Sequence, residues 1–160
     1  MSRVRLALAV LALAGGCDRK PNSAPQLPWQ PHGFRAPTLA CEVVVPTGLK
    51  QVNPMPDHLV ELISTELPPR ELFIISERVE DTLAAAVDRV HQFHAGRSPV
   101  DQDFEGGTLI TVRREDGGFE RVALLERDGL PIIEVIGRSS LENGKARVIE
   151  VASALKCTRK

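Results

Sequence analysis

Residues 108–138 read TLITVRREDGGFERVALLERDGLPIIEVIGR, and this segment carries the clearest structural signal in the sequence. It contains three runs rich in β-branched and other apolar residues, at positions 108–114, 119–127 and 131–138. Asp116-Gly117-Gly118 separates the first two runs, and Asp128-Gly129 separates the last two. An Asp-Gly pair between such runs is a strong hairpin signal, because it accepts the positive φ angles of a tight turn. The stretch therefore predicts a three-stranded antiparallel meander.

The second and third strands of this meander are predicted to be covered on both faces. Apolar residues occupy both alternation positions in Ile132-Ile133-Glu134-Val135-Ile136 and again in Val122-Ala123-Leu124-Leu125. A strand with one face in water would instead alternate apolar and polar residues. The sheet must therefore have a layer of other elements on each side.

Two helices could supply these layers. Leu83, Ala86, Val87, Val90 and Phe93 form one apolar stripe at helical spacing, which predicts a helix at 80–95 that ends before Gly96. Val148, Ala152 and Leu155 form the stripe of a second helix at 143–155, and further strands are predicted at 41–45, 59–63 and 71–79. The predicted fold class is α+β: a single domain at 41–157 with a mostly antiparallel sheet and helices on both faces, an α/β/α sandwich.

This order of elements resembles a known superfamily. A strand that ends in Val45-Pro46-Thr47-Gly48, two more strands, a helix, a charged meander and a closing helix are similar to the PsbP-like fold. That superfamily includes bacterial DcrB-type lipoproteins. The resemblance covers residues 41–157, rests on element order without a diagnostic motif, and implies a non-enzymatic binding or assembly module. It assigns no site residue.

The N-terminus has the pattern of a signal peptide at residues 1–16. Arg3 and Arg5 precede an apolar run at 6–14, and Gly15-Gly16 precede Cys17. Nine apolar residues span about 14 Å as a helix, half of a bilayer core of about 30 Å, so the run is too short for a permanent transmembrane helix. Residues 13–17 resemble the lipobox of bacterial lipoproteins, and the resemblance implies that Cys17 carries the lipid. The alternative is a secreted soluble protein cleaved after Ala14, at the A-x-A site of residues 12–14.

Residues 17–40 are predicted to be a lipid-anchored, Pro-rich tether. The segment holds five of the twelve prolines and lacks apolar periodicity, which favours an extended spacer. Trp29, the only tryptophan, either contacts a membrane or partner or folds back onto the domain as a cap. The predicted location is the bacterial cell envelope, with the lipid in a membrane and the domain facing the periplasm; inner and outer membrane both remain open.

The cysteine count predicts one disulfide bond. If Cys17 of the three cysteines carries lipid, Cys41 and Cys157 remain as an even pair in an oxidising compartment. They bracket the domain, at the start of its first strand and just past its last helix. Two buried free thiols are the alternative, and a Cys41 nucleophile with His58 as its base is the less favoured enzymatic interpretation.

The sequence contains no recognisable catalytic set and predicts no cofactor. Its 20 basic and 21 acidic residues provide no basic field for nucleic acid. Metal binding by Asp88, His91 and His94 is disfavoured, because the three fan across the helix and His94 falls on the apolar stripe. Residues 101–106 begin like a calcium loop, but position 12 would be Val112, so a solvated acidic loop is expected.

The expected function is therefore binding. We expect an envelope protein partner, with Arg113, Arg121 and Trp29 as weak candidates for contact with it. The meander arginines interleave with glutamates, a pattern that also fits ordinary surface pairs worth about 0.2–1 kcal/mol each. The alternative is a lipoprotein that binds a small ligand in a pocket between helix 80–95 and the sheet.

Overall fold

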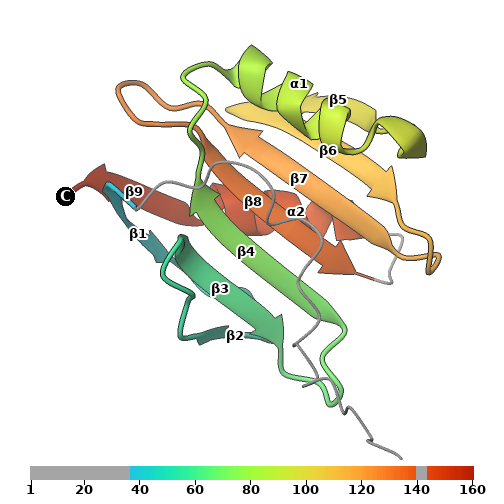
Figure 1. The fold of residues 1–160 in the computed structure, drawn as a ribbon. Helices are drawn as coiled ribbons and strands as arrows, with labels where there is room; N and C mark the ends of the chain where they lie inside the picture. Colours follow the sequence, from blue (N-terminus) through green and yellow to red (C-terminus); the bar gives the residue numbers. More distant parts are fainter. Residues whose placement is uncertain (1–36, 140–143) are drawn as a thin grey trace, which may run out of the picture. The chain divides into compact units, whose positions relative to one another are not determined.

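A computed structural model of the chain describes residues 37–139 and 144–160 (Figure 1). Cys17, Trp29, the predicted signal peptide and most of the predicted tether lie outside these residues. The elements in chain order are β1 (Leu39–Val43), β2 (Leu49–Val52), β3 (His58–Ser64), β4 (Glu71–Glu77), α1 (Leu83–Phe93), the 3₁₀ turn η1 (Ala95–Arg97), β5 (Val100–Phe104), β6 (Gly107–Arg113), β7 (Phe119–Leu125), β8 (Ile133–Ser139), α2 (Gly144–Ser153) and β9 (Leu155–Arg159).

The strands form two antiparallel sheets. The larger sheet has seven strands in the order β2-β3-β4-β8-β7-β6-β5, and β1 pairs with β9 in a separate two-stranded sheet. The predicted meander is confirmed as β6-β7-β8, with its two hairpins at the Asp-Gly positions. Strand β4 pairs with the free side of β8, so β8 lies in the middle of the large sheet.

The two α-helices of the described residues cover opposite faces of the large sheet, as predicted. Helix α2 packs on β7 and β8, whereas α1 packs on β6 and β7 (Figure 1). Because side chains alternate along a strand, Val135 of β8 points toward Val148 and Val151 of α2, while Ile136 points to the α1 side. The α+β sandwich with helices on both faces is therefore confirmed.

The apolar core lies mainly between α2 and the sheet. Its buried side chains come from both sheets and α2: Leu39, Leu49, Val60, Leu62, Phe73, Ile75, Leu109, Ala123, Leu125, Ile133, Val135, Val148, Val151, Ala152 and Leu155. Gly137 of β8 allows α2 to approach, because a Cβ there would lie 2.4 Å from Val148 Cγ2 and 3.0 Å from Phe73 Cε1. No helix of the described residues is long and apolar enough to cross a membrane.

Three strands were not predicted, and each has a physical reason. Strand β5 occupies the stretch expected to be an acidic loop, and it pairs with β6 as the sheet edge. Its exposed Asp101, Gln102 and Asp103 hide the strand pattern, although charge on an edge strand protects it from further pairing. Strand β2 is short, and β9 begins at Leu155, where the apolar spacing of α2 continues past the end of the helix.

The first strand is also placed differently from the prediction. It begins at Leu39 rather than residue 41, so Leu39 and Ala40 belong to the domain and not to the tether. It pairs with β9 rather than with the large sheet. Glu77, buried at the end of β4, accepts hydrogen bonds from the backbone N–H groups of Thr38 and Leu39, at 2.8 and 3.2 Å. This carboxylate fixes the point at which the chain enters the domain.

Cys41 and Cys157 face each other across the β1–β9 ladder and form the predicted disulfide bond. Their Cα atoms are 4.1 Å apart, close to the spacing of a non-hydrogen-bonded antiparallel pair. The bond spans 116 positions of the sequence, so it closes nearly the whole described chain into one loop.

We expect the disulfide to contribute a large part of the domain's stability. Replacing Cys41 and Cys157 together by Ala should lower the free energy of unfolding by up to about 4–5 kcal/mol, because the unfolded chain gains the entropy of a long open loop. Urea denaturation of the double variant, beside wild type with and without reductant, measures the effect. Reduced wild type should match the variant. An unfolding midpoint unaffected by reduction would contradict the assignment.

The close contact at Gly137 gives a second test. Gly137→Ala should destabilise the domain by about 1–3 kcal/mol, because the added methyl group has no space between Val148 and Phe73. Gly96→Ala is the matched control, since no atom lies within 4 Å of a Cβ at that position. Thermal denaturation should show a clear decrease in Tm for the first variant and a change within about 0.5 kcal/mol for the second.

Candidate functional site

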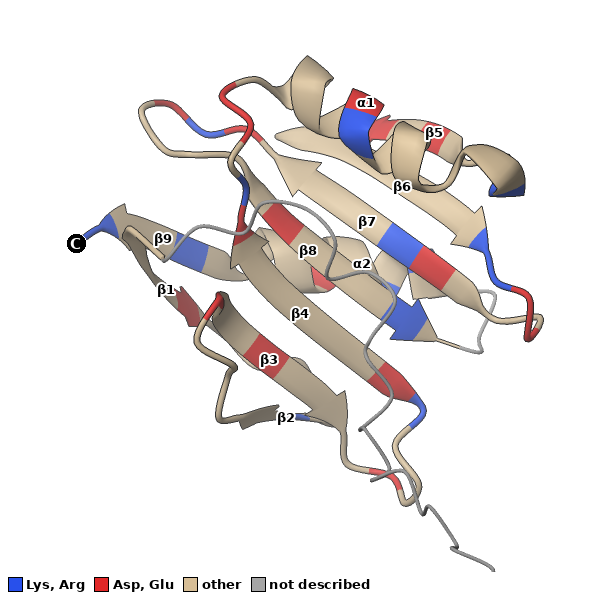
Figure 2. Cartoon of the chain, in the orientation of Figure 1, with Lys and Arg blue, Asp and Glu red and all other residues tan. Residues whose placement is uncertain are grey.

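The α1 side of the large sheet carries buried charges. Glu120 of β7 and Glu134 and Arg138 of β8 point to this side, because they alternate with the residues that face α2. Figure 2 shows charged residues along the middle strands β7 and β8 and not only at the edges of the sheet. Glu134 is only 2% exposed. Such a group is costly to bury unless it is paired or neutralised, so its surroundings decide its chemistry.

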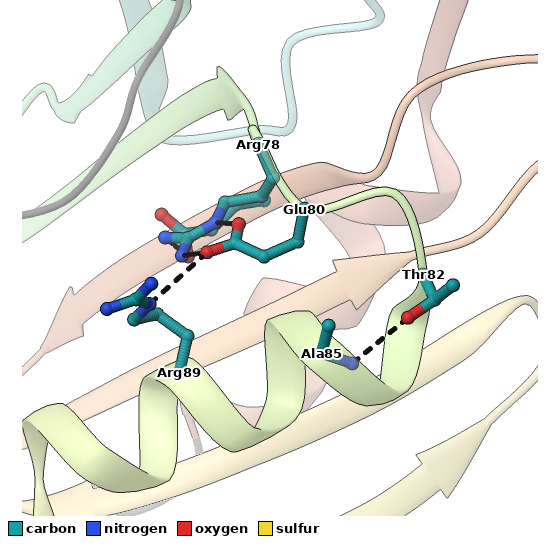
Figure 3. A network of polar contacts seen from close by, with 6 residues as sticks. Arg78, Glu80, Thr82, Ala85 and Arg89 are labelled. Atoms are coloured by element: carbon teal, nitrogen blue, oxygen red, sulfur yellow. Dashed lines mark hydrogen bonds and ion pairs between the residues drawn. The ribbon is translucent and has the colours of Figure 1, made fainter.

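The first cluster on this face centres on Arg78, just after β4. Its Nη1 donates to Glu134 Oε2 at 2.9 Å, and its Nε and Nη2 donate to the two carboxylate oxygens of Glu80 at 2.8 and 2.9 Å. Arg89 of α1 lies 3.5 Å from Glu80 Oε1 (Figure 3). Arg78 thus binds Glu80 in the two-point geometry that guanidinium and carboxylate groups favour, and its single hydrogen bond to Glu134 ties the segment before α1 to β8.

Helix α1 begins immediately after this cluster. Thr82 is its N-cap, and its hydroxyl oxygen accepts a hydrogen bond from the Ala85 N–H at 3.2 Å (Figure 3). This cap satisfies one of the free N–H groups of the first turn. The helix therefore starts three residues later than predicted, and Glu80 is free to pair with Arg78 from the preceding segment.

The second cluster holds the other end of α1. Glu120 lies between His94, whose Nε2 is 3.1 Å from Oε1, and Arg138, whose Nε donates to Oε2 at 2.9 Å. Burial alone would raise the pKa of Glu120, but the hydrogen bond from His94 and the charge of Arg138 hold it below its ordinary value. His94 is buried as predicted for a histidine at the edge of the core, whereas Phe93 is partly exposed.

Glu134 differs from Glu120 in its ionisation. Burial raises the pKa of Glu134 to about 7; Arg78 opposes this shift, while the negative charges of Glu80 and Glu120 add to it. Its Oε1 and the hydroxyl of Ser76, which lies opposite it on β4, are buried without a hydrogen-bond partner among the described contacts. The centre of this face thus holds a carboxyl group that exchanges a proton near neutral pH.

The remaining sequence-predicted residues are distributed over the domain. Arg113 is exposed at the end of β6. Arg121, expected on the surface, is 1% exposed, and its guanidinium lies 4.6 Å from the centre of the Phe119 ring. Alternation places it on the α2 side, next to Gly144, so a partner could not contact it in this structure.

The histidines considered as metal ligands, and the cysteine and histidine considered as a catalytic pair, have different partners in the structure. His91 pairs with Asp101 at 2.7 Å and His94 with Glu120, so the two rings contact different carboxylates. Cys41 is held in the disulfide, and His58 Nδ1 lies 2.6 Å from Glu61 Oε1. Cys41 therefore has no free thiol to act as a nucleophile.

Two of the hollows that described residues line lie away from the space between α1 and the sheet. One, of about 600 Å³, lies where β4 begins and β8 ends, beside the β6–β7 hairpin. The other, of about 500 Å³, lies beside the chain ends, and its lining residues include Thr38, Asp81, Arg159 and Lys160. The pocket expected between helix 80–95 and the sheet stays a prediction.

Comparisons with known proteins place few constraints on the chain. No protein-family model matches it, and no curated protein matches it in sequence. In structure it is similar to LpqN, described as involved in cell envelope biogenesis of Mycobacterium tuberculosis, with a TM-score of 0.40 and 12% sequence identity over 75% of this chain and 84% of that chain. This similarity is too low to carry a functional argument. The PsbP-like resemblance stays a prediction.

The raised pKa of Glu134 gives a pH-dependent test. The Glu134 carboxyl group binds its proton more tightly in the folded state than in the unfolded state, so protonation of Glu134 stabilises the fold. This contribution is complete below pH 4.5 and is lost as the pH rises through about 7. The free energy of unfolding of wild type relative to Glu134→Gln should therefore fall between pH 5 and pH 8, by at most about 3 kcal/mol. Urea denaturation at four pH values in this range measures it.

Glu115→Gln is the control for this experiment. Its carboxylate is 89% exposed and pairs at the surface with Arg97, so removing its charge should change the free energy of unfolding little at any pH between 5 and 8. A similarly constant difference for Glu134→Gln would show that Glu134 does not titrate near neutral pH.

Proposed function

We propose that the protein is a lipid-anchored component of the bacterial cell envelope whose α+β domain binds another envelope component without catalysing a reaction. The observation that carries this proposal is the Cys41–Cys157 disulfide, which closes the domain directly after the predicted tether. Disulfides of this kind persist in exported proteins and are rare where thiols are kept reduced. The bond therefore supports export independently of the N-terminal pattern.

Lipidation of Cys17 supplies the attachment in this proposal. Two observations support Cys17 as the lipidated residue. Residues 13–17 resemble a lipobox, and Cys17 is the cysteine left over once Cys41 and Cys157 have paired. Removal of residues 1–16 leaves a net charge of −3, so the chain as a whole has no general electrostatic attraction to an anionic membrane surface. The acyl chains must provide the binding energy, at about 0.8 kcal/mol per buried CH₂ group.

The buried charged groups of the domain hold helix α1 on the sheet, and this supports binding rather than catalysis. Arg78, Glu80 and Arg89 join the start of α1 to the sheet, and His94, Glu120 and Arg138 join its end. These ionisable groups serve to position a helix. A sheet with a helix fixed on each face suits the presentation of a surface to a partner.

Two alternatives stay open as proposals. The 600 Å³ hollow at the end of the sheet favours a small-ligand binder, because its volume is in the range of ligand sites. A secreted soluble protein cleaved after Ala14 would keep the same disulfide and domain. Purification from the membrane fraction distinguishes the first alternative from the proposal. A small-ligand binder should co-purify with a small molecule, whereas the proposed function predicts a specific protein partner.

The anchor is tested by one substitution. Cys17→Ser should abolish acylation and move the protein from the membrane fraction to the soluble or precursor pool, because no other residue can accept the lipid thioether. Intact-mass analysis of wild type should show the acyl chains directly. Cys41→Ser is the matched control, since it removes a different cysteine and should leave the mass added by the acyl chains and the recovery in the membrane fraction unchanged. A wild-type mass that matches cleavage after Ala14 would contradict the anchor.

A further inference from the structure

The 600 Å³ hollow at the end of the large sheet combines arginines with apolar side chains. Arg70 comes from the β3–β4 turn, Arg114 from the β6–β7 hairpin and Arg138 from β8. Ile63, Leu72 and Pro69 contribute apolar surface, and Leu72 is paired in register with both Ile63 and Arg138. The hollow is thus a built feature, because three segments distant in sequence converge on adjacent positions of the sheet.

The charges of this hollow favour an anion. Burial lowers the pKa of Arg138; Glu120 opposes the shift, and the positive charge of Arg114 lowers the pKa further, so the two guanidinium groups lie within reach of each other's field. Glu71 and Asp116 also line the hollow, and Glu66 and Glu120 pair with Arg70 and Arg138 beside it, so each arginine has one carboxylate partner. The positive charges of Arg114 and Arg138 still oppose each other, and an anion between them would relieve this repulsion.

Two of the arginines are accessible to a ligand. The side chain of Arg114 is 31% exposed and that of Arg70 is 66% exposed. Arg114 Nη2 donates to Asp116 Oδ2 at 2.6 Å, and Arg70 Nε lies 3.3 Å from Glu66 Oε2. A guanidinium has five N–H donors in a planar fork, so a carboxylate neighbour does not exhaust its capacity to bind a phosphate.

The apolar part of the hollow narrows the class of ligand. An inorganic phosphate fills only a small part of 600 Å³ and would leave Ile63 and Leu72 uncovered. Leu67, in the same turn as Pro69 and Arg70, is 90% exposed. A ligand that has a phosphate at one end and an apolar part at the other matches both halves.

We propose that this hollow binds a phosphate-bearing amphiphile, namely the headgroup region of an anionic lipid. The phosphate lies against Arg70 and Arg114 beside Arg138, and the first apolar segment lies on Ile63 and Leu72. This inference goes beyond the proposed function and does not depend on acylation of Cys17, so either can fail while the other stands.

Calorimetric titration of the purified mature chain tests the proposal, in phosphatidylcholine nanodiscs if the chain is acylated and in buffer if it is not. The probes are dihexanoylphosphatidylglycerol, dihexanoylphosphatidylcholine and inorganic phosphate, with empty nanodiscs for the background heat. Phosphatidylglycerol should bind at least about tenfold more tightly than the other two, because only it presents a net negative charge and an apolar part together.

Arginine variants locate the binding. Arg114→Gln and Arg70→Gln should each weaken phosphatidylglycerol binding by about five- to tenfold, since each removes one charged contact with the phosphate. Arg113→Gln is the matched control: it removes the same charge from the neighbouring, exposed residue, which does not line the hollow, and should leave the affinity unchanged. Circular dichroism confirms that the variants are folded.

Four outcomes would overturn the proposal. Absence of phosphatidylglycerol binding would remove it outright. Equal weakening by Arg113→Gln would show a general attraction of surface charge. Equal affinity for phosphatidylcholine would show that the negative charge is not recognised, and equal affinity for inorganic phosphate would show that the apolar part contributes nothing.

Discussion

Strands β7 and β8 are buried on both faces, and this burial determines where the helices and the charged side chains lie. Strands without a wet face need a covering layer on each side, and α1 and α2 provide these layers. The polar side chains of those strands are then buried as well and need partners inside the protein. Glu120, Arg121 and Glu134 are such residues, and the segments around α1 supply ionic partners for the two glutamates.

The two faces of the sheet combine packing and charge in different proportions. On the α2 side, apolar side chains interlock around Gly137, and non-directional burial supplies the free energy. On the α1 side, Ala86 and Val90 of the helix are buried over apolar residues of the sheet such as Ile110 and Val122, and ion pairs fix the two ends of the helix. Buried ion pairs add little net stability, because desolvation opposes their attraction, but they restrict the arrangement of the groups they join. Apolar packing and charge geometry therefore define the position of α1 together.

The sequence predicted the parts of the fold that depend on local pattern. The meander followed from its Asp-Gly turns and the two-sided covering from Ile132–Ile136, while the disulfide followed from the cysteine count. Strand β5 was missed because its exposed edge carries Asp101-Gln102-Asp103, and β9 was missed because Leu155 continues the helical spacing of α2. The burial of Glu120 and Arg121 could have been inferred, since a strand covered on both faces leaves no wet position for a charge. The hollow near Arg114 could not, because it depends on how two distant turns approach the end of the sheet.

The disulfide also determines how the domain would bear mechanical load. Ahead of Cys41, the β1–β9 ladder holds the pairs Leu39↔Arg159 and Ala40↔Thr158, Leu39 packs in the apolar core, and Thr38 and Leu39 donate hydrogen bonds to Glu77. A force that pulls the chain away from the domain could break these contacts one after another, but it would then meet a covalent bond. From there the tension passes through Cys157 into β9. Rupture of the S–S bond, or its reduction, is therefore required before such a force can unravel the sheet from this end.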